Sequence, residues 1–192
     1  MSNELSGRTV AFLVANEGAE QVELTSPWQA VEDSGGSPEL LAPDKGKVQA
    51  FNHLDRGDTF KVDKTVDKAE PSDYDAIVLP GGVASPDRLR AVPAAVDFVR
   101  AMFAAGKPAA VICHGPWTLV EGDLVRGRTL TSWPSLQTDI RNAGGTWVDN
   151  EVQIDVSGPN VLVTSRKPDD LPAFDKEMIA QFAGAKTKVA PG

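Results

Sequence analysis

The sequence predicts a three-layer α/β/α sandwich with a mostly parallel central sheet. Short, nearly continuous apolar runs recur along the chain, which is the pattern of strands covered on both faces. Segments with helical spacing lie between these runs, and this alternation indicates parallel βαβ units. A length of 192 residues, with 41% hydrophobic and 24% charged residues, suits a single domain. We expect this domain to span residues 1–192, with its core at about residues 8–185.

The first βαβ unit is expected near the N-terminus. Residues 8–15 form an apolar run rich in β-formers and predict the first strand, which ends in a loop at residues 16–18. Residues 20–34 have mixed helical spacing and predict a helix, which Pro27 is expected to interrupt or delay. Residues 39–42 lie between two prolines and predict a second strand beside the first.

Residues 45–73 are polar and predict a small antiparallel excursion from the main sheet. Two strands are expected there, at residues 48–51 and 59–66, around a tight turn at residues 55–58 that contains glycine and aspartates.

The second half of the chain repeats the alternation of strand and helix. Residues 75–79 predict a buried strand, residues 93–105 an amphipathic helix ended by Gly106, and residues 108–113 another strand. A helix is expected to start at once, around Gly115. The later elements are expected to be a helix at 137–143, strands at 146–148, 152–156 and 161–164, and a last helix near 171–182.

The charge balance argues against partners that carry negative charge. Lys and Arg number 19 against 27 Asp and Glu, which gives a net charge of −8 and disfavours nucleic acid and anionic lipid surfaces. The apolar runs are far shorter than the ~20 residues needed to cross a bilayer. Residues 1–7 lack the pattern of a secretory leader, so a cytoplasmic protein is expected.

The chain has one cysteine, Cys113, and it directly precedes one of the two histidines, His114. A lone cysteine excludes an internal disulfide, and together with the scattered carboxylates it predicts no metal site and no cofactor. Its position between a strand and a helix could lower the thiol pKa to about 3.5–7.5. A buried, inert cysteine is an equally good interpretation of the position alone. The other histidine, His53, lies in a polar loop and is expected at the surface.

The expected strand at residues 108–113, with Cys113 at its end and a helix directly after it, resembles the nucleophile elbow of hydrolases. The carboxyl ends of parallel strands meet at one edge of the sheet, so the amides of His114 and of Gly82 or Val83 are expected to lie close together. There they would stabilise a developing oxyanion. Gly81 and Gly82 follow a predicted strand, so a simple tight turn is the competing interpretation. Trp117 lies close to the cysteine and could line a pocket.

The chain resembles the PfpI-type members of the DJ-1/PfpI superfamily over nearly its whole length. The resemblance rests on ANEGAEQVEL from Ala15, DAIVLPGG from Asp75, SPDRLR from Ser85, KPAAVICHGPW from Lys107, VRGRTLTSWPS from Val125, DIRNAGGTWVDNEV from Asp139 and VLVTSRKPDDLPAF from Val161. It implies a flavodoxin-like sheet, similar to that of class I glutamine amidotransferases. An amidotransferase activity is disfavoured, because no histidine follows His114.

The resemblance implies roles for individual residues. Cys113 would be the nucleophile, His114 its proton-transfer partner, and Glu20 the carboxyl group that hydrogen-bonds the sulfur. The chain has an extra residue between Asn16 and this glutamate relative to the common pattern, so Glu17 and Glu23 remain rivals.

Asp87 matches an acidic residue that the resemblance implies may reach across a dimer interface to orient the histidine. A homo-oligomer, at least a dimer, is therefore expected. An N-terminal residue of a short helix is the competing interpretation of Asp87.

Two classes of function fit these residues. The first is a cysteine-dependent enzyme acting on a small carbonyl compound, peptide or protein, as a peptidase, deglycase or glyoxalase with a role in stress protection. The second is a non-catalytic redox-sensing or chaperone-type stress protein with an oxidisable Cys113.

Overall fold

The computed structural model describes residues 3–185, and a seven-stranded sheet forms its centre. The strands of this sheet are β1 (Thr9–Leu13), β3 (Ser37–Ala42), β6 (Lys64–Thr65), β7 (Ala76–Leu79), β8 (Ala109–Ile112), β11 (Val152–Asp155) and β12 (Leu162–Ser165). Their order is β11-β12-β8-β7-β1-β3-β6. Neighbours are parallel except for β11, which is antiparallel to β12. The predicted mostly parallel sheet is confirmed.

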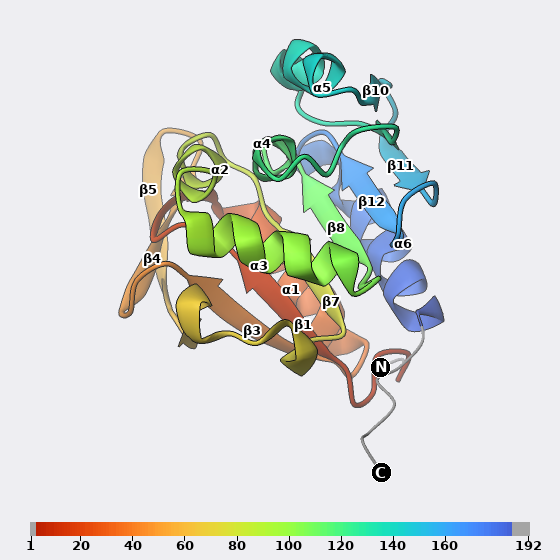
Figure 1. Cartoon of the computed structure of the whole chain (residues 1–192). Helices are drawn as coiled ribbons and strands as arrows, with labels where there is room; N and C mark the ends of the chain where they lie inside the picture. Colours follow the sequence, from red (N-terminus) through yellow and green to blue (C-terminus); the bar gives the residue numbers. More distant parts are fainter. Residues whose placement is uncertain (1–2, 186–192) are drawn as a thin grey trace.

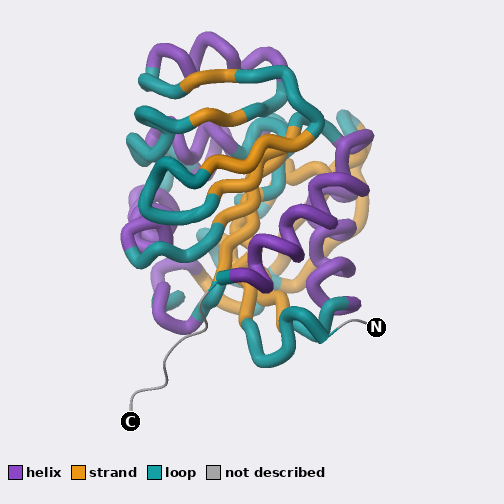
Figure 2. Tube along the Cα trace, turned by 90° about the vertical axis from the view of Figure 1, so that its right-hand side faces the viewer, coloured by secondary structure: helices purple, strands orange, loops and turns teal. Residues whose placement is uncertain are grey.

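Helices cover both faces of this sheet, as Figure 1 and the side view in Figure 2 show. They are α1 (Gln21–Asp33), α2 (Ala84–Leu89), α3 (Pro93–Ala104), α4 (Pro116–Glu121), α5 (Gln137–Asn142) and α6 (Leu171–Gly184). Short 3-10 segments lie at Val66–Lys68, Pro71–Asp73, Pro134–Leu136 and Pro168–Asp170. One core cluster joins the sheet to α3 and α4, and the other joins it to α1 and α6. The three predicted layers are therefore present.

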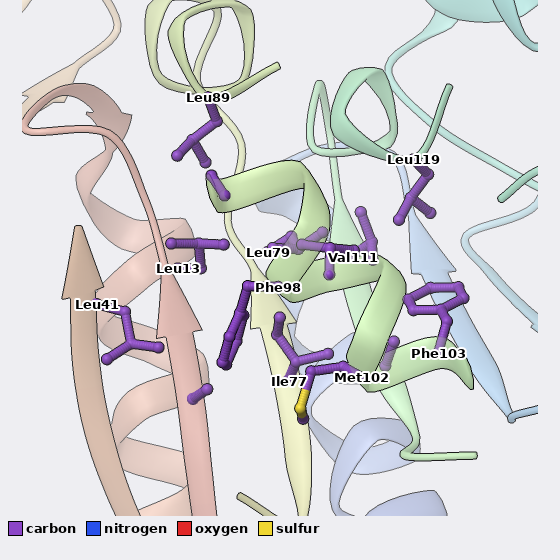
Figure 3. Close-up of a cluster of buried hydrophobic side chains, with 14 of the residues drawn as sticks. Leu13, Leu41, Ile77, Leu79, Leu89, Phe98, Met102, Phe103, Val111 and Leu119 are labelled. Atoms are coloured by element: carbon purple, nitrogen blue, oxygen red, sulfur yellow. The ribbon is translucent and has the colours of Figure 1, made fainter. Parts of the chain in front are cut away.

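Alternate residues of each central strand belong to opposite core clusters, because side chains of a strand alternate between its faces. In β1, Ala11 and Leu13 lie in the cluster under α3, whereas Val10 and Phe12 lie in the cluster under α1 and α6. Figure 3 shows Leu13, with Leu79 of β7 and Val111 of β8, near α3. Burial on both faces explains why these strands are nearly continuous apolar runs.

Helix α1 differs from the prediction at Pro27. The helix starts at Gln21 and runs through Pro27 to Asp33 without interruption. Proline lacks the N–H that would bond to the carbonyl of Glu23 four residues earlier, so one helical hydrogen bond is missing there. The proline ring is buried, and its burial offsets that loss. The expected interruption is therefore wrong.

A separate three-stranded sheet lies beside the N-terminus of α1. It contains β2 (Glu17–Glu20), β4 (Lys47–Asn52) and β5 (Asp55–Lys61), in the order β2-β4-β5. The antiparallel β4–β5 hairpin confirms the predicted excursion, but its turn lies at residues 53–54 rather than 55–58. Residues 64–65 join the main sheet as β6, so the expected single strand at 59–66 is wrong.

Two further short strands, β9 (Thr129–Leu130) and β10 (Thr146–Trp147), pair in parallel away from the main sheet. Within residues 3–185, the helices are all too short or too polar to cross a membrane.

Candidate active site

Cys113 lies in the turn between β8 and α4, at the carboxyl edge of the main sheet. Its φ of 61° is in the left-handed region, which costs a residue other than glycine about 1–3 kcal/mol. Its N–H donates to the carbonyl of Ser165 at 3.1 Å, which ties the turn to β12. A Cβ on Gly115 would lie 2.7 Å from the carbonyl of Leu79, so the turn needs glycine there. Cys113 is thus held in a strained elbow and is 6% exposed.

His114 is brought against the sulfur by the same turn. Its Nδ1 lies 3.1 Å from Cys113 Sγ. The ring stacks on Trp133 at a centroid distance of 5.8 Å and is tilted against Trp117 at 5.1 Å. Burial lowers the pKa of His114 to about 4. The imidazole is therefore neutral at pH 7 and is available to accept a proton.

Glu23, in the first turn of α1, is the carboxyl group next to the sulfur. It is fully buried, and its Oε2 accepts a hydrogen bond from the N–H of Gly81 at 3.0 Å. The carboxyl group also interacts with Cys113. Burial raises the pKa of Glu23 to about 8, assisted by the charge of Glu20 and opposed by the hydrogen bonds from Cys113 and the glycine amides. At neutral pH Glu23 therefore holds a proton.

The expectation that Glu20 hydrogen-bonds the sulfur is corrected by this geometry. Glu20 is the last residue of β2, and its carboxylate accepts a hydrogen bond from the N–H of His53 at 3.1 Å. Helix α1 begins one residue later, so Glu20 remains on the extended segment and faces the small sheet. Only Glu23, one turn further on, reaches under the strand-to-helix turn.

Glu17, the other rival, also lies away from the sulfur. Its carboxylate accepts a hydrogen bond from Arg88 at 2.8 Å and lies 3.9 Å from Arg56. The Arg88 hydrogen bond and charge lower the pKa of Glu17. This exposed ion pair spans β2 and α2.

Gly81 and Gly82 leave the space that the site needs. A Cβ on Gly81 would collide with the carboxyl of Glu23 and lie 2.5 Å from Cys113 Cβ, so these two groups flank the same glycine. Gly82 has a φ of +82°, a left-handed conformation that favours glycine. Burial and the charge of Glu23 raise the pKa of the Cys113 thiol, contrary to the lowering expected from its position, and the amides of Gly82 and His114 oppose this rise as hydrogen-bond donors to the sulfur. The sequence analysis proposed these two amides, with Val83 as the alternative to Gly82, for an oxyanion site.

Of the two side chains Val83 and Trp117, Val83 lines the cavity and Trp117 does not. Val83 is 58% exposed and contributes its side chain to the cavity wall. Trp117 contacts the ring of His114, and its Nε1 donates to Asp139 at 2.8 Å. Trp117 is not among the residues that line the cavity, so it supports His114 from behind.

A cavity of about 410 Å³ opens above the sulfur. Its walls come from the β2–α1 segment, the β4–β5 hairpin, helix α2 with the loop before it, and the loops that follow β8, β9 and β12. The lining residues are Glu17, Gly18, Glu20, Glu23, Phe51, His53, Leu54, Gly82, Val83, Ala84, Arg88, Cys113, His114, Trp133 and Pro168.

His53 is a lining residue that the sequence analysis assigned only to the surface. It is exposed, but it stands at the hairpin turn with a φ of 58°, between Phe51 and Leu54, which also line the cavity. No local signal identifies these three residues, because the folding of the hairpin over α1 brings them to the site.

Asp87 does not contact His114 within the described chain. It lies on α2, and its carboxylate accepts hydrogen bonds from Nε and Nη2 of Arg90 at 3.1 and 2.6 Å. The Arg90 guanidinium in turn lies 4.8 Å from the ring centroid of Trp117. A reach of Asp87 across a dimer interface stays a prediction.

Among residues 3–185, no group of three His, Cys, Asp or Glu side chains could hold a metal ion.

Comparisons with known proteins agree with this arrangement. Residues 8–181 match the sequence model described as the DJ-1/PfpI family. The chain is 42% identical to the protein named deglycase PH1704 of Pyrococcus horikoshii, over 88% of this chain and 96% of the relative. It is 38% identical to the putative cysteine protease YraA of Bacillus subtilis, over 90% and 96%.

A solved structure from Anabaena variabilis, a two-domain protein with DJ-1/ThiJ/PfpI-like and ferritin-like domains, superimposes with a TM-score of 0.83 at 32% identity. The match covers 96% of this chain and 52% of that one. With the family match over most of its length and these identities, the chain belongs to the DJ-1/PfpI family.

Proposed function

We propose that the protein is a cysteine-dependent deglycase, which removes dicarbonyl adducts from amino or thiol groups with Cys113 as the nucleophile. One geometric observation carries the proposal: Cys113 Sγ lies 3.1 Å from His114 Nδ1 and next to the buried carboxyl group of Glu23. Burial raises the pKa of Glu23 to about 8 and lowers that of His114 to about 4. The name of the P. horikoshii relative supports this reaction class.

The protonation of Glu23 decides whether a thiolate can form. Burial of the sulfur and the ionised form of Glu23 both raise the pKa of the Cys113 thiol. When Glu23 keeps its proton, its charge is absent and its O–H donates to the sulfur, which favours the thiolate. The amides of Gly82 and His114 act in the same direction. His114 Nδ1, at 3.1 Å, accepts the thiol proton.

The reaction that we propose needs water but no external oxidant. The thiolate displaces the amine or thiol of the adduct from its carbinol carbon, and His114 returns a proton to that leaving group. A proton then moves from this carbon to the neighbouring ketone carbon, so that the first carbon is oxidised and the second reduced. The resulting hydroxyacyl thioester is hydrolysed to a hydroxy acid and free Cys113. The Gly82 and His114 amides stabilise the negative oxygen that develops during the proton shift and again when water adds to the thioester.

The size of the cavity suits a modified side chain. A volume of about 410 Å³, closed on one side by the β4–β5 hairpin, is within the range of small-ligand sites. Removing reactive adducts would protect other proteins, which fits the proposed role in stress protection.

The test uses methylglyoxal adducts of N-acetylated amino acid amides, with released lactate and free amine or thiol followed by NMR. Wild-type protein should release both products, and Cys113→Ser should lose at least ~10³-fold in rate, since the nucleophile is gone. Glu32→Gln, an exposed change on α1, serves as the control and should keep wild-type turnover.

Three results would overturn the proposal. Lactate release from free methylglyoxal but not from the adducts would indicate a glyoxalase. Hydrolysis of fluorogenic peptides without adduct turnover would indicate a peptidase. Clean oxidation of Cys113 to sulfinate, without turnover of any of these substrates, would indicate a redox sensor.

A further inference from the structure

Glu20 is a carboxylate in the cavity that the proposed reaction does not use. It lines the same cavity as the sulfur, and its only hydrogen bond within the described chain is from the backbone N–H of His53. No lysine or arginine of residues 3–185 forms an ion pair with it. Glu17, at the same mouth, differs because Arg88 already neutralises it at 2.8 Å.

The remaining charges of the cavity leave Glu20 as its unmatched anion. Glu23 is protonated at pH 7 and His114 is neutral, and the charges of the lining residues Glu17 and Arg88 cancel. Arg56, 3.9 Å from Glu17, is largely exposed and does not line the cavity. A half-buried carboxylate without a cation favours a ligand that carries a positively charged hydrogen-bond donor, since charge-assisted hydrogen bonds are about twice as strong as neutral ones.

The backbone of Glu20 packs against the glycine turn beside the sulfur. A Cβ on Gly82 would lie 2.6 Å from the backbone nitrogen of Glu20, and Gly82 is the glycine whose amide donates to the sulfur. The charge of Glu20 also acts on Glu23, the neighbour of the sulfur. A substrate that reaches the sulfur therefore occupies a cavity that also contains the Glu20 carboxylate.

The apolar lining fits the body of a cationic side chain. Phe51 and Trp133 line the cavity, and aromatic faces attract guanidinium and ammonium groups. Leu54 and Val83, both largely exposed, add aliphatic surface for the methylene stem.

We propose that Glu20 is a specificity-determining residue that selects adducts carrying a positive charge next to the reacting carbon, a guanidinium or an ammonium, over neutral thiol adducts. This inference rests on the proposed deglycase function. Adducts of arginine and lysine share the required charge, and adducts of cysteine lack it.

The kinetic test compares kcat/KM for methylglyoxal adducts of N-acetylargininamide, N-acetyllysinamide and N-acetylcysteinamide. We expect wild type to prefer the two cationic adducts by about tenfold, and Glu20→Gln to reduce this ratio to near one. Glutamine still accepts the hydrogen bond from His53, so this substitution removes the charge and keeps the contact. Glu32→Gln makes the same change in net charge away from the cavity and should keep the wild-type ratio.

A binding test makes the inference independent of turnover. Cys113→Ser protein is titrated with N-acetylargininamide and with the neutral isostere N-acetylcitrullinamide, and binding is followed by isothermal titration calorimetry. The arginine compound should bind about tenfold more tightly, and Glu20→Gln in the same background should abolish the difference. Equal binding of both compounds, or a kinetic ratio unchanged in Glu20→Gln, overturns the inference. Selective binding without turnover by wild type would overturn the proposed function alone.

Discussion

Three carboxylates, Glu17, Glu20 and Glu23, lie within seven residues and have three different environments. Glu17 and Glu20 are both half-buried, but Glu17 is paired with Arg88 and Glu20 has no cation, whereas Glu23 is fully buried beside the sulfur. The difference follows from the change from strand to helix at Gln21, since a strand and a helix aim successive side chains differently. At the residue scale, the backbone conformation therefore assigns the roles.

Glu23→Gln should remove an ionisation from the site. In wild type, kcat/KM for an adduct should fall as pH rises through about 8, because Glu23 loses its proton and its charge then opposes the thiolate. Glutamine still donates a hydrogen bond and cannot ionise, so the alkaline fall should be absent from the variant. A fall near pH 8 that persists in Glu23→Gln would contradict the assignment.

The same substitution has a second, structural readout. The folded protein holds the Glu23 proton up to pH about 8, whereas the unfolded chain loses it near 4.5. This contribution to stability is therefore present below pH 4.5 and is lost as pH rises towards 8. Between pH 5 and 8 the free energy of unfolding of wild type should therefore fall, relative to that of Glu23→Gln, by on the order of 2–4 kcal/mol. Urea titrations at both pH values measure the difference, and Glu32→Gln should show no such gain.

At the element scale, the β4–β5 hairpin is fixed to the start of α1 by a two-way contact. Gln21 Nε2 donates to the Asp58 carboxylate at 2.8 Å, and the N–H of Asp58 donates to Gln21 Oε1 at 2.6 Å. A Cβ on Gly57 would collide with Gln21 Oε1. Since the hairpin carries Phe51 and His53 into the cavity, this contact holds one wall of the site.

Gly57→Ala should loosen that wall. The methyl group displaces the Gln21 amide and breaks both hydrogen bonds to Asp58, so KM for the adducts should rise about three- to tenfold, while alkylation of Cys113 by iodoacetamide should change less than twofold. Steady-state kinetics and thiol labelling measure the two effects. Gly184→Ala, where a Cβ meets nothing within 4 Å, is the control. An unchanged KM in Gly57→Ala would show that the contact does not shape the site.

At the scale of the whole molecule, His114 lacks a carboxylate partner within the described chain. Its ring contacts are Cys113, Trp117 and Trp133, and Asp87, on the exposed side of α2, is paired with Arg90. A base that moves protons is usually oriented by a third group. We therefore keep the prediction of a dimer in which Asp87 of one subunit orients His114 of the other.

Mixed dimers test this prediction. The Asp87→Asn and Cys113→Ser variants should each have strongly reduced activity alone. A mixed dimer of the two has one complete site, with the intact cysteine from one subunit and the intact Asp87 from the other. An equal mixture formed by co-expression should regain about a quarter of wild-type activity, as half of the dimers are mixed and each has one complete site. A mixture no more active than its parents, or a fully active monomer in light scattering, would exclude the arrangement.

The sequence by itself determined the layered sheet and the position of Cys113 between a strand and a helix. Runs such as residues 9–13 are apolar at every position because both faces are buried, and that pattern needs no tertiary information. The adjacency of Cys113 and His114 after a strand likewise predicted the strand-to-helix turn. These features are local, since they depend on residues within one or two elements.

Only the tertiary structure decided which glutamate meets the sulfur and which residues close the cavity. Glu23 was one of three candidates until the strand β2 and the start of α1 fixed its direction, and Pro27 did not end the helix because its ring is buried. His53 reaches the site through the fold of a hairpin 60 residues before the cysteine. Contacts between segments so far apart depend on packing and on buried charge, and neither leaves a periodic pattern in the sequence.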